Sequence, residues 1–321
     1  MMYRLVWSLS MFTIVHTAVG CATDLAPTSR DAASDTTARA QPDIASGAEP
    51  DTHEYPLVLE GPQVTPQTEL HLDGKVGACG HDAATFQWTV IQPQGSQGVF
   101  KPSSTHPTPT VVANVVGDYR FELQTYNFNG QPCDHISHYT VSVLPTTALH
   151  VELTWTTPGD PDETDTGPAA GSDLDLHFYQ HLSGPPEQTW FDSFADCYWL
   201  NPNPNWGDAS PTADDDPSLD RDDTDGAGPE NLSLNHAEPG AEFGVMVHYW
   251  SSHGFGESSA QVRVYWHGEL AYESLPVTLQ QLDGWDVGTF SWATGEFFPT
   301  TDDAGGPVIL SGLENPLLTE P

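Results

Sequence analysis

The chain has 321 residues, of which 45 are acidic and only 8 are basic, so its formal net charge is −37. This charge argues against binding to nucleic acid or to an anionic membrane surface, because both require clustered basic residues. The 28 glycines, 28 prolines and many aromatic residues favour a turn-rich β protein over a helical one.

Residues 1–20 have the pattern of an export signal, with Arg4 followed by a mostly apolar stretch. The stretch ends in Ala18-Val19-Gly20-Cys21, which resembles the lipobox of bacterial lipoproteins. That resemblance implies acylation of Cys21, and the residue after it, Ala22, implies sorting to the outer membrane or cell surface. Ordinary cleavage that leaves Cys21 as a spare thiol is the alternative.

Residues 21–54 are rich in Ala, Thr, Ser, Asp and Pro and contain few large apolar side chains. Such a segment cannot bury enough surface to fold, so we predict a disordered linker. Two β-sandwich domains are expected after it, an immunoglobulin-like one over residues 55–145 and a larger one over residues 146–296. Residues 297–321 are expected to form a flexible tail.

The first folded unit consists of short alternating strands separated by turn residues, with Trp88 in a central strand. It resembles a PKD-type domain in three segments: LHLDG at 70–74, FQWTV at 86–90 and GDYRFEL at 117–123. The resemblance implies a spacer or adhesion module of an exported protein. Cys79 and Cys133 precede strands at the same end of such a sandwich, and export favours a disulfide between them. Cys197 is then expected to be a buried free thiol.

In the second unit, residues 173–179 alternate between apolar and polar side chains. Leu174 and Leu176 are expected to face the core, whereas Asp173, Asp175 and His177 are expected on an exposed face. Long acidic connections interrupt the strands, and the one around residues 214–226 holds seven Asp. Loops of this length are usually functional or disordered.

Three segments of this unit resemble the YfaP-like family of exported domains of unknown function. They are SDLDLHF at 172–178, LDRDDTDGAGPENL at 219–232 and GAEFGVMVHY at 240–249. The resemblance implies an exported, Asp-rich β-sandwich and supplies no activity.

Oxygen ligands at this density suit a hard cation, so we predict a calcium site in the second unit. The candidate ligands are Asp173, Asp175, Asp220, Asp222, Asp223, Asp225 and Glu230. The alternative is that these residues form turns on a solvated acidic surface.

Other chemistry has weaker signals. His177 and His181 are too far apart along a strand to share an ion and are expected to be structural, and His248 is expected at the surface. Trp206 is the candidate for stacking on a sugar, with a structural loop anchor as the alternative. The sequence has no recognisable catalytic set, so an enzyme is not expected.

These observations predict an exported, lipid-anchored surface module that binds or supports an unidentified cell-surface polymer or protein. A carbohydrate-binding protein is the first alternative, and a hydrolase with acids in the acidic loops is the second.

Overall fold

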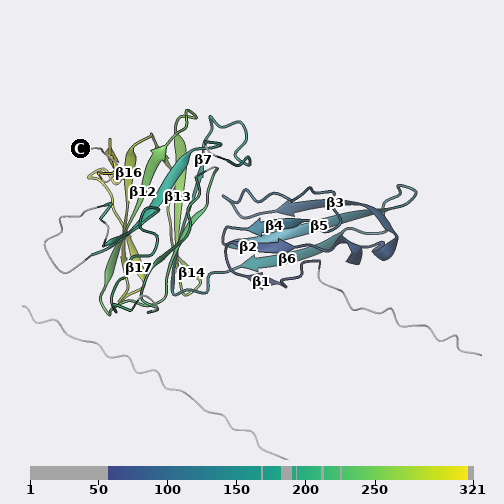
Figure 1. The fold of residues 1–321 in the computed structure, drawn as a ribbon, viewed down its shortest axis with the longest axis horizontal. Coiled ribbons are helices and arrows are strands. Elements are labelled where there is room, and N and C mark those ends of the chain that lie inside the picture. Colours follow the sequence, from purple (N-terminus) through teal and green to yellow (C-terminus); the bar gives the residue numbers. More distant parts are fainter. Residues whose placement is uncertain are drawn as a thin grey trace, which may run out of the picture. The chain divides into compact units, whose positions relative to one another are not determined.

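A computed structural model describes residues 57–167, 169–181, 190–192, 194–210, 213–224 and 226–316. The regular elements in this part of the chain are strands, apart from two 3-10 helices, η1 (Gly74–Val76) and η2 (Gly80–Asp82). The strands form sheets that pack as sandwiches (Figure 1). The predicted all-β class is therefore confirmed. The predicted leader and linker, including Cys21, lie outside the described residues.

The first sandwich pairs a four-stranded sheet with a two-stranded one. The larger sheet has the order β1 (Gln63–Val64), β6 (Ser137–Val143), β5 (Gly117–Asn127) and β3 (Ala83–Ile91), and the smaller sheet pairs β2 (Thr68–His71) with β4 (Thr110–Ala113). Alternation in β5 buries Tyr119, Phe121 and Leu123 in the core. Trp88 of β3 is buried among them, and its indole N–H donates to the carbonyl of His106. The central tryptophan expected from the sequence is thus confirmed.

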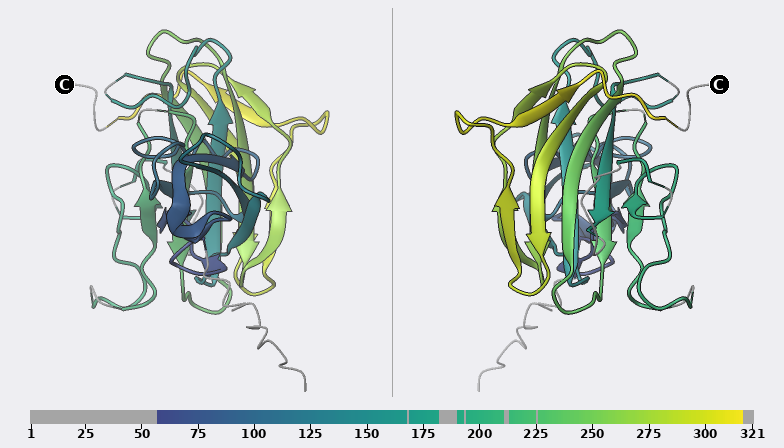
Figure 2. Two further views of the ribbon diagram at one scale, coloured as in Figure 1. Left: turned by 90° about the vertical axis from the view of Figure 1, so that its right-hand side faces the viewer. Right: turned by 90° about the vertical axis from the view of Figure 1, so that its left-hand side faces the viewer.

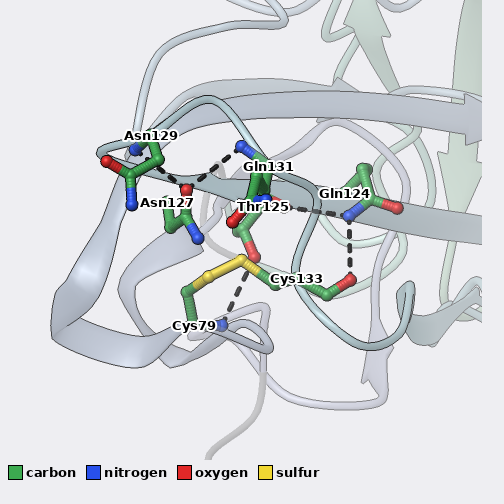
Figure 3. The surroundings of a disulfide bond; sticks show 7 residues. All are labelled: Cys79, Gln124, Thr125, Asn127, Asn129, Gln131 and Cys133. Carbon is green, nitrogen blue, oxygen red and sulfur yellow. Dashed lines mark hydrogen bonds between the residues drawn. A yellow bond between two sulfur atoms is a disulfide. The ribbon is translucent and has the colours of Figure 1, made fainter.

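A disulfide joins Cys79 and Cys133, whose Cα atoms lie 5.6 Å apart (Figure 3). Thr125 of β5 holds both halves: its hydroxyl accepts from the backbone N–H of Cys79, and its carbonyl accepts from that of Cys133. The predicted pairing is confirmed. Cys197 is free and buried, also as predicted.

The second sandwich consists of two six-stranded sheets with a shared apolar core. One sheet has the order β10 (Ser218–Arg221), β11 (Glu230–Leu234), β7 (Leu149–Thr156), β13 (Ser258–Trp266) and β14 (Glu269–Glu273), with β15 (Val277–Leu279) also paired to β13. The other has the order β17 (Glu296–Pro299), β16 (Asp283–Ser291), β12 (Glu242–Ser251), β8 (Asp173–Gln180) and β9 (Asp196–Cys197), with β18 (Val308–Ser311) also paired to β16. The right-hand view of Figure 2 faces this second sheet.

The prediction of a flexible tail from residue 297 is wrong as far as residue 316. Both β17 and β18 pair with β16 and complete the sheet. Phe297 is buried and stacks on Tyr272, with ring centroids 4.4 Å apart. Burial of this aromatic ring favours a strand over a flexible tail, although many of the neighbouring residues in the sequence are polar or turn-forming. In the described part of the chain, no helix is long and apolar enough to cross a membrane.

The outer face of the sheet that contains β8 and β12 carries a second, smaller core. It includes Tyr179, Trp190, Phe191, Tyr198 and Met246. Loop residues after β8 therefore cover a sheet face that would otherwise be solvated. This covering layer makes both faces of β8 interior.

Candidate metal centre

Strand β8 supplies the polar side chains of the candidate site. Its residues alternate as predicted, with Leu174 and Leu176 in the main core and Asp173, Asp175 and His177 on the opposite face. That opposite face is not exposed, however: these three residues are 7%, 2% and 0% exposed. The expectation of a solvated face is wrong: the rings of Phe191 and Tyr198 lie against His177, and Asp222 lies beside Asp173 and Asp175.

Three carboxylates converge beside this face. Asp175 comes from β8, Asp222 from the connection after β10, and Glu230 from the start of β11. One carboxylate oxygen of each lies within 4.8 Å of the others. Asp175 and Glu230 are buried, whereas Asp222 is exposed. Three acidic groups from distant parts of the sequence thus meet at one edge of the sandwich.

Glu230 is fixed by two backbone groups. Its Oε2 accepts from the N–H of Leu176 at 2.6 Å, and its Oε1 accepts from the N–H of Asp223 at 3.2 Å. Strand β9 pairs with β8 only at Phe178 and Tyr179, so the N–H of Leu176 lies beyond the end of that ladder. The carboxylate replaces the missing strand partner and is held rigidly as a result.

Burial and mutual repulsion raise the pKa values of three of these carboxyl groups. Burial, followed by the charge of Asp175, raises the pKa of Glu230 well above its ordinary value. The same causes raise the pKa of Asp222, and that of Asp173 to about 8. Taking several carboxylates out of water at short range favours either protonation or a bound cation.

The remaining predicted ligands have other surroundings. Asp220 is exposed, and its side chain forms hydrogen bonds with Ser218 of β10 and Ser233 of β11. Asp223 is buried and forms an ion pair with Arg221 at 2.7 Å. Asp225 lies outside the described residues. Of the seven predicted ligands, Asp175, Asp222 and Glu230 are therefore brought together, and Asp173 lies on the same face of β8.

A second group that sequence reasoning missed shares Asp175. One ligand atom each of Asp175, His177 and His248 lies within 4.8 Å of the others, and all three residues are buried. His248 is directly opposite Asp175 in the antiparallel pairing of β12 with β8.

The expectation that His248 lies at the surface is wrong, since its side chain is 0% exposed. The signal was its position inside the apolar run Val245–Tyr249. A strand apolar on both faces is interior, and a histidine within it needs polar partners.

Trp206 is not available for stacking on a sugar. It is 5% exposed, and its ring stacks against Phe178 and Phe243, with centroids 5.8 Å and 5.7 Å away. Its indole N–H donates to the carbonyl of Phe194 at 2.9 Å. The ring is a structural loop anchor, the alternative that the sequence left open.

The strand orders define two β-sandwiches, one from a four-stranded and a two-stranded sheet and one from two six-stranded sheets. No known protein family matches the chain, and no curated protein does either. Among solved structures, the crystal structure of the chicken CNTN1 FN1–FN3 domains matches with 11% sequence identity and a TM-score of 0.20. The match covers 68% of this chain and 64% of that one. These comparisons identify no family, and the PKD-type and YfaP-like resemblances stay predictions.

Proposed function

We propose that the protein is an exported, lipid-anchored surface module with a binding or structural rather than an enzymatic role, and that calcium stabilises its second sandwich. The observation that carries the calcium proposal is the convergence of Asp175, Asp222 and Glu230. The anchor proposal rests on the lipobox-like segment before Cys21. The resemblances to PKD-type and YfaP-like domains support an exported spacer or adhesion module.

Calcium fits this set because all the ligand atoms are oxygens. Calcium takes six to eight oxygen ligands, so carbonyls and water would complete the shell. Buried, unpaired oxygens are present: Oδ1 of Asp173 and Oδ2 of Asp175 have no hydrogen-bond partner among the described residues. Extracellular calcium modules typically bind with Kd of about 10⁻⁴–10⁻³ M, which suits an exported protein.

Thermal unfolding of the full chain, first freed of metal with a chelator, tests the calcium site. Binding to the folded state alone stabilises it by about 1.4 kcal/mol when calcium is tenfold above its Kd. We expect millimolar calcium at constant ionic strength to raise the Tm of the second sandwich. Asp222→Asn should remove this shift, and because Asp222 is exposed the variant should still fold.

Asp220→Asn is the matched control. It changes the same charge two residues away, but Asp220 is outside the cluster, so the calcium shift should persist. An equal shift in the Asp222→Asn variant, or from sodium at matched ionic strength, would show general charge screening and overturn the calcium site.

The anchor is tested by cell fractionation after export. Cys21→Ser should move the protein from the membrane fraction to the soluble fraction. Calcium binding should be unchanged, because the predicted linker decouples the anchor from the sandwiches. A wild-type chain that is already soluble after export would rule out lipidation. The proposed partner is a cell-surface polymer or protein of unassigned chemistry.

A further inference from the structure

We propose that a divalent transition metal ion of the zinc class binds between Asp175, His177 and His248. This site goes beyond the proposed calcium site, with which it shares only Asp175. Each of the three side chains has one buried polar atom without a hydrogen-bond partner in the described part of the chain. These atoms are Oδ2 of Asp175, Nε2 of His177 and Nδ1 of His248.

Hydrogen bonds at the far side of each ring expose the nitrogen lone pair that a metal needs. Nε2 of His248 lies 2.8 Å from the carbonyl of Leu313, which can only accept, so this nitrogen carries the proton. Nδ1 of His177 lies 2.7 Å from Oδ2 of Asp196, which also accepts from the N–H of Phe191. In the neutral rings, Nδ1 of His248 and Nε2 of His177 are therefore the basic atoms. Metal-binding histidines almost always donate their other N–H to a carboxylate or carbonyl in this way.

The spacing of the ligand atoms fits a metal better than a direct hydrogen bond. Nδ1 of His248 lies 3.6 Å from Oδ2 of Asp175, beyond the usual range for an N–H···O bond. Zinc–nitrogen and zinc–oxygen bonds of about 2.0–2.2 Å place neighbouring ligands of a tetrahedral site about 3.4 Å apart. Imidazole nitrogen together with carboxylate oxygen is a donor set for zinc, iron, nickel or copper rather than for calcium.

The surroundings keep both rings in place. The ring of Tyr198 stacks on His177 at 4.8 Å, and Phe191 meets both histidines edge-on at 4.9 Å and 5.3 Å. On the next strand, Gly284 pairs with His248, and a Cβ there would meet the side chain of Leu313 at 2.5 Å. The missing side chain leaves room for Leu313, whose carbonyl orients His248. The rival explanation is two metal-free histidine–aspartate pairs.

Zinc binding to the metal-free full chain separates these explanations. Calorimetry of the metal-free Asp222→Asn chain, whose carboxylate cluster lacks one ligand, should show one zinc ion bound per chain when zinc is the added metal. His248→Gln should weaken zinc binding at least tenfold. His150→Gln is the matched control, because it removes another buried histidine from a different sheet and should leave zinc binding unchanged.

A visible absorption spectrum of the wild-type protein tests the site without a substitution that could prevent folding. Cobalt added in place of zinc should give the intense visible bands of a four-coordinate site with nitrogen ligands. Failure of wild type to bind zinc, or an unchanged affinity in folded His248→Gln, would overturn the proposal.

The two metal sites can fail separately. Zinc binding that survives Asp222→Asn supports the histidine site whatever the calcium result. Zinc binding lost in Asp222→Asn but kept in His248→Gln would place the ion in the carboxylate cluster and overturn this proposal.

Discussion

Removal of the disulfide in the first sandwich should cost about 4 kcal/mol of stability. The bridged residues, Cys79 and Cys133, are 54 positions apart, and the loop they close contains β3, β4 and β5. In the chain-entropy treatment, closing a loop of this length lowers the entropy of the unfolded chain by about 14 cal/mol/K, or about 4 kcal/mol at 25 °C. Domains of this size have a total stability of about 5–15 kcal/mol, so the bridge accounts for a large share.

The test replaces both cysteines by serine, which avoids leaving one reactive thiol. Tryptophan fluorescence is a poor probe, because Trp88 is one of ten tryptophans in the chain. Hydrogen exchange followed by mass spectrometry across a urea series reports on each sandwich separately. Peptides from β3 and β5 should lose protection at lower urea, while β8 and β12 serve as the internal reference. A loss below about 1 kcal/mol would refute the entropic account.

Three further outcomes are expected. Burial lowers the pKa of His150 to about 4, below the ordinary value of about 6.5, so the unfolded state takes up its proton first as pH falls. The contribution of the neutral ring to stability, about 3 kcal/mol in all, is complete above pH 6.5 and is lost as the pH falls to 4. In His150→Gln, the free energy of unfolding measured in urea should therefore depend less on pH between 6.5 and 4. Burial raises the pKa of the Cys197 thiol, so iodoacetamide should label it only after unfolding, as read by mass spectrometry. Trp206→Ala should cost about 3–5 kcal/mol in urea unfolding, whereas Phe194→Ala, at an 80% exposed side chain, should cost less than about 0.5 kcal/mol.

Alternation along strands made much of the fold predictable. It indicated the all-β class, the buried Trp88 and the division of β8 into an apolar and a polar face. The disulfide was predictable because Cys79 and Cys133 flank strands at one end of a sandwich. Alternation says which side chains share a face, but not whether another layer covers that face. The burial of His177 and His248, on which Phe191 packs, depends on such a layer and was therefore missed.

The acidic loop shows a second limit of sequence reasoning. Asp220, Asp222 and Asp223 are chemically equivalent in the sequence, yet only Asp222 joins the carboxylate cluster. The pairing of β10 with β11 shifts register between Leu219 and Arg221, which leaves Asp220 as the extra residue of a bulge. An irregularity of this kind changes which later side chains point toward the site. The composition of the loop predicts a cation site but does not indicate which of the carboxylates are its ligands.

The position of Asp175 connects the two proposed ions. Its carboxylate belongs to an all-oxygen group with Asp222 and Glu230 and to a nitrogen-containing group with His177 and His248. A buried carboxylate without a counter-charge opposes folding, and packing alone would favour an apolar residue there. The described residues place one cation near the cluster, Arg221, which pairs with Asp223 instead. Both proposals therefore predict that bound metal ions offset the cost of burying Asp175, so that removal of metal should lower the free energy of unfolding of the second sandwich.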